Sequence, residues 1–541
     1  MTATVTVNEL LEGHVGLDVE CLDRIYLNGY VPSLQVGGQV VSFIRQHLGL
    51  PIPSPAILER IGTSFRRAVY DFADTGHIPI VRFAKGDRKV EVMGRHLAAQ
   101  ARTGRSGVAA IGLAQEFQNV FAVSRREGPG DLPWFSFYRA DRRVTCFYFY
   151  LWDVDFGPAF IKICAYFPYP IKVWVNGHEW AKRQAVHAGI GFTELSNGFA
   201  ACDDPAGLQA ICDRLGPGTI AVFFERWMSR LPLPLTGADR AAGYWWELSM
   251  RQVETSRTLV FDAPRHARGF FEALVADNLD LGRPDSVELI FQGHRGHWGR
   301  PPRVEPTYKT KILTRQTTGV TVNVFFKHSR VKQYLKDGRA LRIETVINSP
   351  DDLACHRRLQ HLDELQTKSR DVNRRLLDTE RVGQGCVLAS PAFERVAQST
   401  LTEDGRRSPA LRFGDPRVMA LLGALCVALN ALGFTNRSLR AQVSQLLGVP
   451  TTDYTVNQAS YDLARLRLNG LIQRRPHTNT YDLTPDGQRV AIFYTKVHHR
   501  LLRPLLAADQ PPAPPDLRHA LTTIDRHVHA YTHHAHLQTA A

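Results

Sequence analysis

The order of elements predicted between residues 415 and 503 constrains the fold more than any other feature of the sequence. Three helices with apolar stripes are predicted first, over residues 416–433, 435–448 and 455–470. Two short runs, "LIQRRP" and "TYDLT", then flank a turn at His477–Asn479, and a helix that begins near Thr484 follows. In the third helix, the side chains available for the inward face are Tyr461, Leu463, Leu466 and Leu468.

The segment "YDLARLRLNGLIQRRPHTNTYDLTPDGQRVA" resembles the winged helix-turn-helix domains of bacterial regulators. The resemblance covers about ninety residues, within a block predicted to run from 405 to 505. It implies that the third helix enters the major groove of a duplex and that the hairpin forms the wing. Winged helices also dock proteins, so a partner-dependent subunit of a complex stays open as an alternative reading.

The third predicted helix and the hairpin carry the side chains that would contact a duplex. A helix of about 10–12 Å diameter fits a major groove roughly 12 Å wide. The side chains that can offer donors and acceptors to base edges are Asn457, Gln458 and Ser460. The side chains that can meet phosphates or the minor groove are Arg465, Arg467, Arg474, Arg475 and His477.

Charge and cysteine usage narrow the partners and the compartment. The formal net charge of +14 over 541 residues favours a polyanionic partner, and we expect DNA, with RNA as a second possibility. The eight cysteines form no C-x-x-C pair, which is typical of a reduced, cytoplasmic protein. The N-terminus lacks the pattern of a signal peptide, and no run of about eighteen apolar residues exists, so no membrane partner is expected.

The chain is predicted to be multidomain, with an α/β N-terminal region, an α+β centre and a C-terminal winged helix. The predicted blocks are 1–130, an aromatic-rich 131–240 that continues the first or stands apart, a basic 241–385 with a long helix, 405–505, and a Pro/His-rich tail over 506–541. In the first block, strands alternate with a helix that begins after Ser54 and ends at Gly76. This alternation predicts a mostly parallel sheet.

Two pairs of carboxylates are candidate metal ligands. Asp18 and Glu20 alternate along a predicted strand, and Asp153 and Asp155 alternate between apolar strands. Oxygen ligands suit hard cations, so these four residues are the candidate ligands of Mg²⁺ or Mn²⁺ and the candidate catalytic carboxylates of a metal-dependent nuclease. The simpler interpretation is that each acid caps a turn or pairs with a nearby cation such as Arg24.

Two further basic segments are candidate phosphate contacts. In "VWVNGHEWAKRQ", Asn176-Gly177 predicts a turn into a helix that carries Lys182 and Arg183. In the central block, cations alternate with Phe326 and Tyr334, which suits tracking of a nucleic-acid backbone. These central cations are Lys327, Arg330, Lys332, Lys336, Arg339 and Arg342. In both segments a solvated or capped surface is the plainer interpretation.

The segments "FIKICAYFPYPIKVWVNGHEWAKRQ", "ADRAAGYWWELSMRQVE" and "LRFGDPRV" are similar to a group of bacterial proteins to which no activity is attached. Walker A, G-x-G-x-x-G, G-x-S-x-G and H-E-x-x-H motifs are missing, so nucleotide, NAD, serine-hydrolase and zincin chemistry lose ground. We therefore expect a nucleic-acid-binding protein of mobile-element, replication or repair type, with nuclease activity as an open question. The alternative is a non-catalytic regulator with a ligand or partner pocket in the aromatic-rich region.

Overall fold

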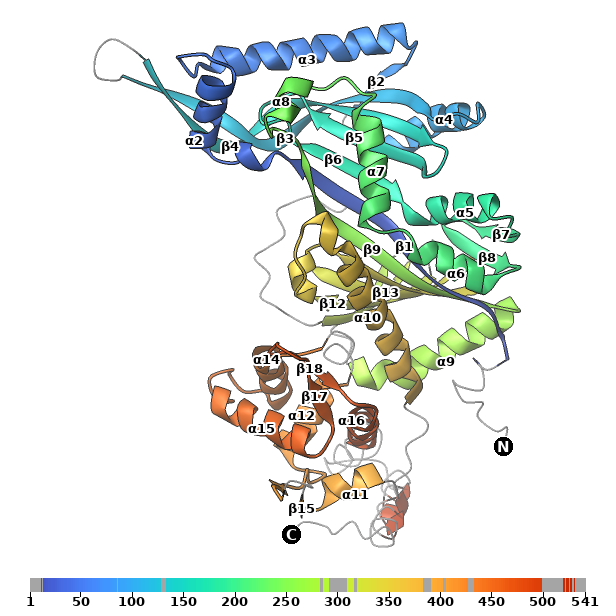
Figure 1. Cartoon of the computed structure of the whole chain (residues 1–541). Coiled ribbons are helices and arrows are strands. Elements are labelled where there is room, and N and C mark those ends of the chain that lie inside the picture. Colours follow the sequence, from blue (N-terminus) through green and yellow to red (C-terminus); the bar gives the residue numbers. More distant parts are fainter. Residues whose placement is uncertain are drawn as a thin grey trace. The chain divides into compact units, whose positions relative to one another are not determined.

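The computed structural model describes residue 11, then residues 13–84, 86–127, 133–282, 286–290, 309–315, 319–382, 391–401, 405–426 and 433–498, and parts of 519–530 (Figure 1). The chain divides into two compact units. The first, here the hairpin unit, comprises Leu17–Leu259 and Glu344–Arg370. The second, here the C-terminal unit, comprises Met1–Gly16, Val260–Ile343 and Asp371–Ala541. The predicted boundary between residues 130 and 131 falls inside the hairpin unit, and the predicted domain boundaries stay predictions.

The hairpin unit is a mixed α/β structure around a large mixed sheet. In their order in the sheet, its strands are β14 (Ala340–Ile347), β9 (Glu247–Phe261), β1 (Val15–Tyr30), β6 (Ile171–Asn176), β5 (Gly157–Cys164), β4 (Pro133–Asp153), β3 (Gly107–Glu127) and β2 (Ile80–Arg82). A separate two-stranded sheet pairs β7 (Phe192–Leu195) with β8 (Gly198–Cys202). The helices are α2 (Gly37–Ser42), α3 (Pro55–Thr75), α4 (Lys89–Ala101), α5 (Gly177–His187), α6 (Pro205–Asp213), α7 (Pro217–Met228) and α8 (Gly237–Ala241).

The expectation of a mostly parallel sheet is wrong for this unit. Strand β2 pairs with β3 in parallel, but β3 with β4, β4 with β5, β5 with β6, and β6 with β1 all pair antiparallel. The physical reason is the β3–β4 hairpin, whose two strands have 21 residues each. A hairpin returns the chain along its own partner, so no helical crossover is needed between these strands.

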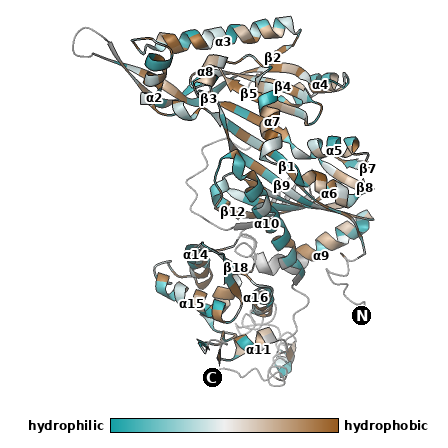
Figure 2. Cartoon of the chain, in the orientation of Figure 1, coloured by the Kyte–Doolittle hydropathy of each residue, from teal (hydrophilic) through white to brown (hydrophobic). Residues whose placement is uncertain are grey.

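The β3–β4 hairpin is paired from Gly107 opposite Trp152 to Glu127 opposite Pro133, with one bulge between Val108 and Ala110. One part of it is buried on both faces, because Cys146 to Leu151 are all at most 6% exposed. Figure 2 shows the strands around β4 and β5 in hydrophobic colours, whereas α10 (Leu362–Val382) is mostly hydrophilic. The core of the sheet therefore lies where β4 pairs with β5, at the end of the hairpin away from its turn.

Helix α3 packs on this sheet as its sequence predicts. Ser54 accepts a hydrogen bond from the Ala56 amide at the first turn, and Gly76 ends the helix. These two residues confirm the predicted start and stop. The buried positions Leu58, Phe65 and Val69 recur at helical spacing, and the Phe65 ring packs edge-on against Phe147 of β4 at 5.8 Å. The helix is therefore fixed against the sheet along one face.

The C-terminal unit holds the remaining strands and helices. Strands β10 (Ser286–Ile290), β11 (Lys309–Arg315), β12 (Gly319–Phe326) and β13 (Ser329–Lys336) follow one another in sheet order, and β10–β11 is a parallel pair. Before residue 405, the helices of this unit are α9 (Pro264–Gly282), the second half of α10, and α11 (Pro391–Ala397). Short strands β15 (Thr400–Leu401) and β16 (Arg407–Ser408) form a further pair.

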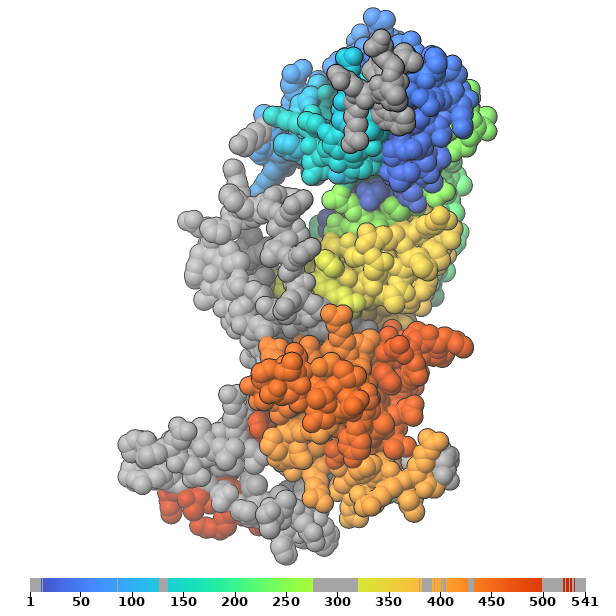
Figure 3. Space-filling view, turned by 90° about the vertical axis from the view of Figure 1, so that its left-hand side faces the viewer, coloured from blue at the N-terminus to red at the C-terminus, as the bar shows by residue number. Residues whose placement is uncertain are grey.

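The last part of this unit is a helical body with one hairpin, and Figure 3 shows it in orange as a continuous surface. Its elements are α12 (Pro416–Ala424), α14 (Asn436–Leu447), α15 (Val456–Leu468), β17 (Ile472–Arg474), β18 (Tyr481–Leu483) and α16 (Pro485–Val497). Thr435, Thr455 and Thr484 cap the starts of α14, α15 and α16, and Gly448 ends α14 with a φ of 69°. The predicted order of helices and hairpin is therefore present. Across the part of the chain that the structure describes, no helix is long and apolar enough to cross a membrane.

Candidate nucleic-acid interface

Helix α15 presents one polar face to solvent and buries the other. Ala459, Leu463 and Leu466 are at most 5% exposed and hold the helix against its neighbours. The exposed stripe consists of Val456, Asn457, Ser460, Tyr461, Ala464 and Arg467. Asp462, the acid of this helix, is buried and bound by Arg417 and Tyr454, so it leaves the exposed stripe without negative charge.

A groove of about 420 Å³ runs beside this stripe, between α14, α15 and the hairpin. Its polar lining comprises Thr435, Asn436, Arg437, Ser460, Arg467 and Asn479. Asn436 donates from Nδ2 to the Ser460 hydroxyl at 3.0 Å, which ties the start of α14 to α15. Arg437 and Arg467 are exposed and have no ion-pair or hydrogen-bond partner in the described ranges. The groove thus combines two available cations with amide and hydroxyl groups.

Three of the predicted arginines are engaged within the protein. Arg465 is half-buried and donates to the backbone carbonyls of Pro409 and Ala410. Arg475 forms two hydrogen bonds, both at 2.7 Å, with the buried carboxylate of Asp482. These two side chains stabilise the body rather than face solvent. Arg474 is exposed and bridges the hairpin turn through the Thr478 carbonyl and the Asn479 side chain.

The other predicted residues of this body separate into exposed and engaged ones. Asn457 and Ser460 lie on the exposed stripe, and His477 lies in the hairpin turn with a φ of 55°. Gln458 instead closes a capping box, since its side chain accepts from the Thr455 amide at 2.8 Å. Tyr461 was expected on the inward face, but 53% of it is exposed. Tyr461 lies at helical spacing from the exposed Asn457 and Ala464, so it shares their face of the helix. The apolar ring of tyrosine had suggested an inward position instead.

Asp153 is a fully buried, fully bonded carboxylate. Arg226 donates to both of its oxygens at 2.9 and 2.8 Å, and the Trp227 indole donates to Oδ2 at 2.7 Å. The amides of Asp155 and Phe156 donate to Oδ1. Asp155 pairs with the other nitrogen of Arg226 at 2.8 Å. The ion pairs with Arg226 offset the desolvation cost of placing two carboxylates in an apolar setting, so these contacts require no metal ion.

Asp18 and Glu20 also lie among protein partners. Arg257 holds Asp18 with two hydrogen bonds, at 3.1 and 2.7 Å, and Glu20 is buried. Strands β1 and β4 are three strand spacings apart in the sheet, which is about 14 Å. The structure therefore does not bring the two acid pairs into one metal site. The Mg²⁺ or Mn²⁺ nuclease stays a prediction that these contacts do not favour.

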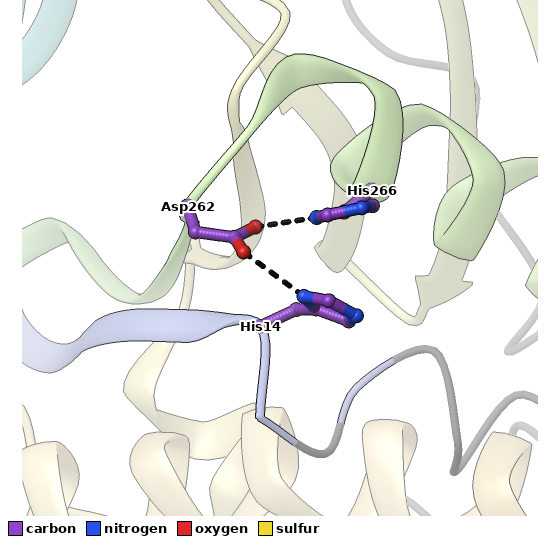
Figure 4. A group of neighbouring side chains, drawn as sticks. All are labelled: His14, Asp262 and His266. Carbon is purple, nitrogen blue, oxygen red and sulfur yellow. Dashed lines mark hydrogen bonds and ion pairs between the residues drawn. The ribbon is translucent and has the colours of Figure 1, made fainter.

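His14, Asp262 and His266 form the group of metal-ligand type within the described residues (Figure 4). Asp262 lies just before α9, and its two oxygens contact Nδ1 of His14 at 2.9 Å and Nδ1 of His266 at 2.6 Å. Hydrogen bonds from both imidazoles hold the pKa of Asp262 below its ordinary value. Two imidazoles and one carboxylate suit Zn²⁺ or Fe²⁺ rather than Mg²⁺. The group therefore differs in ligand type from the predicted carboxylate site, and the Mg²⁺ or Mn²⁺ ion stays a prediction.

Helix α5 begins where the sequence predicts, but its charges are paired. The side-chain oxygen of Asn176 accepts from the amides of His178 and Glu179, which confirms the predicted turn into a helix. Lys182 is buried against Glu179 at 3.1 Å, and Arg183 contacts the same glutamate at 3.0 Å. These two cations lose the freedom that a phosphate site at this helix would need, so the prediction gains no support.

A buried polar cluster lies beside α5. His178 Nε2 contacts Asp23 Oδ1 at 2.5 Å, and the Ser256 hydroxyl donates to the same oxygen at 2.5 Å. His178, Asp23 and Ser256 all have no exposed surface. Burial opposes the protonated form of His178, whereas Cys21 and Asp23 favour it and bring its pKa to about 9. Because no substrate can reach these groups, we interpret them as a structural ion pair.

In the C-terminal unit, the basic strand β13 places several predicted cations on one face. Alternation buries Ser329, Val331 and Gln333 and leaves Arg330, Lys332 and Tyr334 partly exposed, and Lys336 is partly exposed as well. Lys327 lies over the Phe326 ring at 4.8 Å. Arg342 is buried, and Arg339 donates to the carbonyls of Phe261 and Asp262. The β13 face agrees with backbone tracking, whereas Arg342 is buried and the exposed Arg339 is engaged with backbone carbonyls.

Sequence reasoning missed Arg437 and Asn479, which face the groove beside α15. Their signal was their position, since Arg437 is two residues after a predicted cap and Asn479 ends the predicted turn. Comparisons of this chain with protein-family models, with curated proteins and with solved structures gave no match.

Proposed function

We propose that the helical body from residue 415 to 498 is a winged helix and that the protein binds nucleic acid, with duplex DNA as the first candidate. The observation that carries this proposal is the exposed stripe of α15 with the adjoining groove. There Arg437 and Arg467 lack an acidic partner in the described ranges, while the nearby Asp462 is buried. Polar and cationic side chains on an accessible helix suit groove and phosphate contacts.

The charge of this body supports the same proposal. Between residues 415 and 498 the sequence has nine arginine and lysine residues and five aspartates. Three of those aspartates, Asp462, Asp482 and Asp486, pair with arginines inside the body. The excess is therefore positive at the surface, which favours association with a polyanion and makes it dependent on salt.

The proposal does not extend to a nuclease, because the four candidate carboxylates are buried or held by Arg226 and Arg257. The regulator alternative requires an aromatic pocket near residues 134–180. In that region Phe147, Phe149 and Tyr150 are at most 5% exposed and pack within the core. This packing does not favour the regulator, and binding to nucleic acid remains the better supported function.

The test is a binding assay on labelled duplex DNA, duplex RNA and single strands across a salt series, with magnesium, manganese or chelator. We expect the variant R437E/R467E to lose duplex affinity by roughly 10- to 100-fold and to reduce the magnitude of the salt slope by about 2. The matched control R407E/R412E changes the charge by the same amount at two exposed arginines just before the helical body, which do not line the groove. Equal losses in both variants would overturn the proposed contact in favour of general charge attraction. Salt-insensitive binding would overturn the proposal and point to protein docking.

A further inference from the structure

A second basic groove lies in the hairpin unit, between α3 and the β3–β4 hairpin. Its volume is about 610 Å³, and it is open to solvent. The charged side chains that line it are Arg66, Arg125, Arg142, Arg143 and Glu59. Four cations and one acid leave the groove strongly positive. The proposed duplex contact does not use this surface, since all of the groove residues belong to the hairpin unit.

The strand register places two of these arginines on one face of the hairpin. Arg125 is opposite Phe135, and Arg143 is opposite Phe117. Phe117 and Arg125 are eight residues apart on β3, so they point to the same side of the sheet. Eight residues of strand span about 26 Å, and less where the hairpin twists. The two cations therefore mark the ends of an elongated track rather than a compact pocket.

The groove arginines on the strands are available to a ligand. Arg125, Arg142 and Arg143 are exposed, and no described residue forms an ion pair or hydrogen bond with them. Arg66 of α3 donates to the Thr63 hydroxyl at 2.7 Å and lies 4.0 Å from Glu59. A long separation from Glu59 and partial exposure make that contact weak. Three of the four cations can thus reach an anion without breaking a contact.

Aromatic side chains accompany the cations. Phe117, which is paired across the strands with Arg143, has 74% of its surface exposed. Tyr166 lines the groove and is 39% exposed, and Phe135 lines it opposite Arg125. An aromatic ring this exposed can be covered by a ligand without a change in the fold. The bases of nucleic acids have flat faces that stack on such rings.

The walls of the groove are rigid before any ligand arrives. Helix α3 approaches the sheet so closely that a β-carbon at Gly62 would lie 3.0 Å from the Ala165 carbonyl oxygen. Leu58, Phe65 and Val69 anchor the same helix. A pre-organised site loses little conformational entropy on binding. The cations and rings therefore stand at fixed spacings along the hairpin.

We propose that this groove binds single-stranded nucleic acid, with phosphates at Arg125 and Arg143 and a base stacked on Phe117, which lies beside the groove on the same face of the hairpin. Stacking on a protein ring requires an unstacked base, which a single strand offers and a regular duplex does not. An acidic peptide would use the arginines but would have no base for Phe117. The site is separate from the duplex contact of the helical body, so the protein would hold a duplex and a single strand through different units.

The test uses the full chain and a labelled single strand of twelve nucleotides, as DNA and as RNA, across a salt series. We expect R125E/R143E to lower single-strand affinity by roughly 10- to 100-fold and to reduce the magnitude of the salt slope by about 1.4, at 0.7 per phosphate. The matched control R60E/R67E reverses two exposed arginines of α3 that do not line the groove. This control is expected to change the affinity less than about threefold.

Phe117 separates base stacking from simple charge attraction. We expect Phe117→Ala to lower single-strand affinity by roughly 10-fold without changing the salt slope, and Phe117→Trp to retain binding. Polyglutamate that competes as well as the single strand, together with no effect of Phe117→Ala, would overturn the proposal in favour of an acidic peptide. Equal losses in R125E/R143E and R60E/R67E would overturn it in favour of general charge attraction.

The two nucleic-acid proposals fail separately. The variant R437E/R467E is expected to lose duplex binding and retain single-strand binding, whereas R125E/R143E is expected to do the reverse. Loss of single-strand binding in R437E/R467E, with none in R125E/R143E, would place the single strand on the helical body and overturn the groove. Retained duplex binding in R437E/R467E would leave the groove proposal intact and contradict the proposed function alone.

Discussion

The interior of the hairpin unit and the surface of α15 use charge in opposite ways. Asp153 has no exposed surface, and Arg226, Trp227 and two backbone amides bind it. Arg467 is exposed and has no acidic partner in the described part of the chain. In the sequence, both residues belong to short motifs that predict a functional site, a metal site for Asp153 and a phosphate contact for Arg467. The difference teaches that burial and bonding partners, rather than charge spacing, separate charges that stabilise the fold from charges that can meet a ligand.

The strongest test of the interior charges is the substitution Asp153→Asn. It leaves Arg226 without its buried countercharge and is expected to lower the free energy of unfolding of the hairpin unit by about 3–5 kcal/mol. Chemical denaturation followed by tryptophan fluorescence measures the change. The control Asp155→Asn alters the half-exposed partner of the same arginine and is expected to cost less than about 1 kcal/mol. Metal-dependent cleavage that Asp153→Asn abolishes without loss of stability would reverse this interpretation.

The buried pair of His178 and Asp23 predicts a pH dependence. The pKa of His178 in the folded state is about 9, above its ordinary value of 6.5. Between these values the folded protein holds a proton that the unfolded chain has released, so stability is complete below pH 6.5 and falls as pH rises through 9. The loss is expected to be about 2–3 kcal/mol. His178→Gln should abolish this slope, and the exposed His187→Gln on the same helix should preserve it.

Glu380 of α10 gives a second pH dependence of stability, which burial causes rather than a nearby charge. Burial raises the pKa of Glu380 to about 8, although Gln333 donates to it at 2.8 Å. The folded protein therefore holds a proton that the unfolded chain lacks above pH 4.5, and stability declines as pH rises toward 8. Glu380→Gln removes this cost and is expected to raise the free energy of unfolding at pH 8 by about 4 kcal/mol. Asp378→Asn on the same helix is the control, and an equal gain there would contradict the explanation.

The smallest change in the free energy of unfolding is expected when the exposed arginines beside α15 are replaced. The variant R437E/R467E alters exposed side chains without partners in the described ranges, so its free energy of unfolding should stay within about 0.5 kcal/mol of the wild-type value. Thermal unfolding of the two proteins side by side measures it. A large loss of stability in this variant would show that Arg437 or Arg467 supports the helical body, and the two classes of charge would no longer be distinct.

Local signals in the sequence predicted elements well and side-chain roles less well. Ser54, Gly76 and Gly448 mark helix ends through short-range backbone chemistry, which a linear sequence contains. The engagement of Arg465 with carbonyls near residue 410 depends on a contact between segments 55 residues apart. The parallel-sheet prediction failed because a long hairpin and a helical crossover give similar strand patterns at the start of the chain.

The second groove was beyond sequence reasoning for the same reason. Arg66 comes from α3, whereas Arg125 and Arg143 come from two strands whose register sets their common face. The sequence did contain one usable signal, since Phe117 lies between the polar residues Glu116 and Gln118 in "EFQNVF". Such alternation indicates a half-exposed strand, but only the structure shows that Phe121 is buried while Phe117 is exposed.

The length of the β3–β4 hairpin also bears on the order in which the chain folds. Its first pair, Glu127 with Pro133, joins residues only six apart, whereas its last pair, Gly107 with Trp152, joins residues 45 apart. If pairing starts at the turn, each new pair lengthens the closed loop only slightly and costs little extra entropy. The ribbon can therefore zip from the tip and act as a template on which α3 condenses. Folding of this unit should begin with contacts that are local in sequence, despite the width of the final sheet.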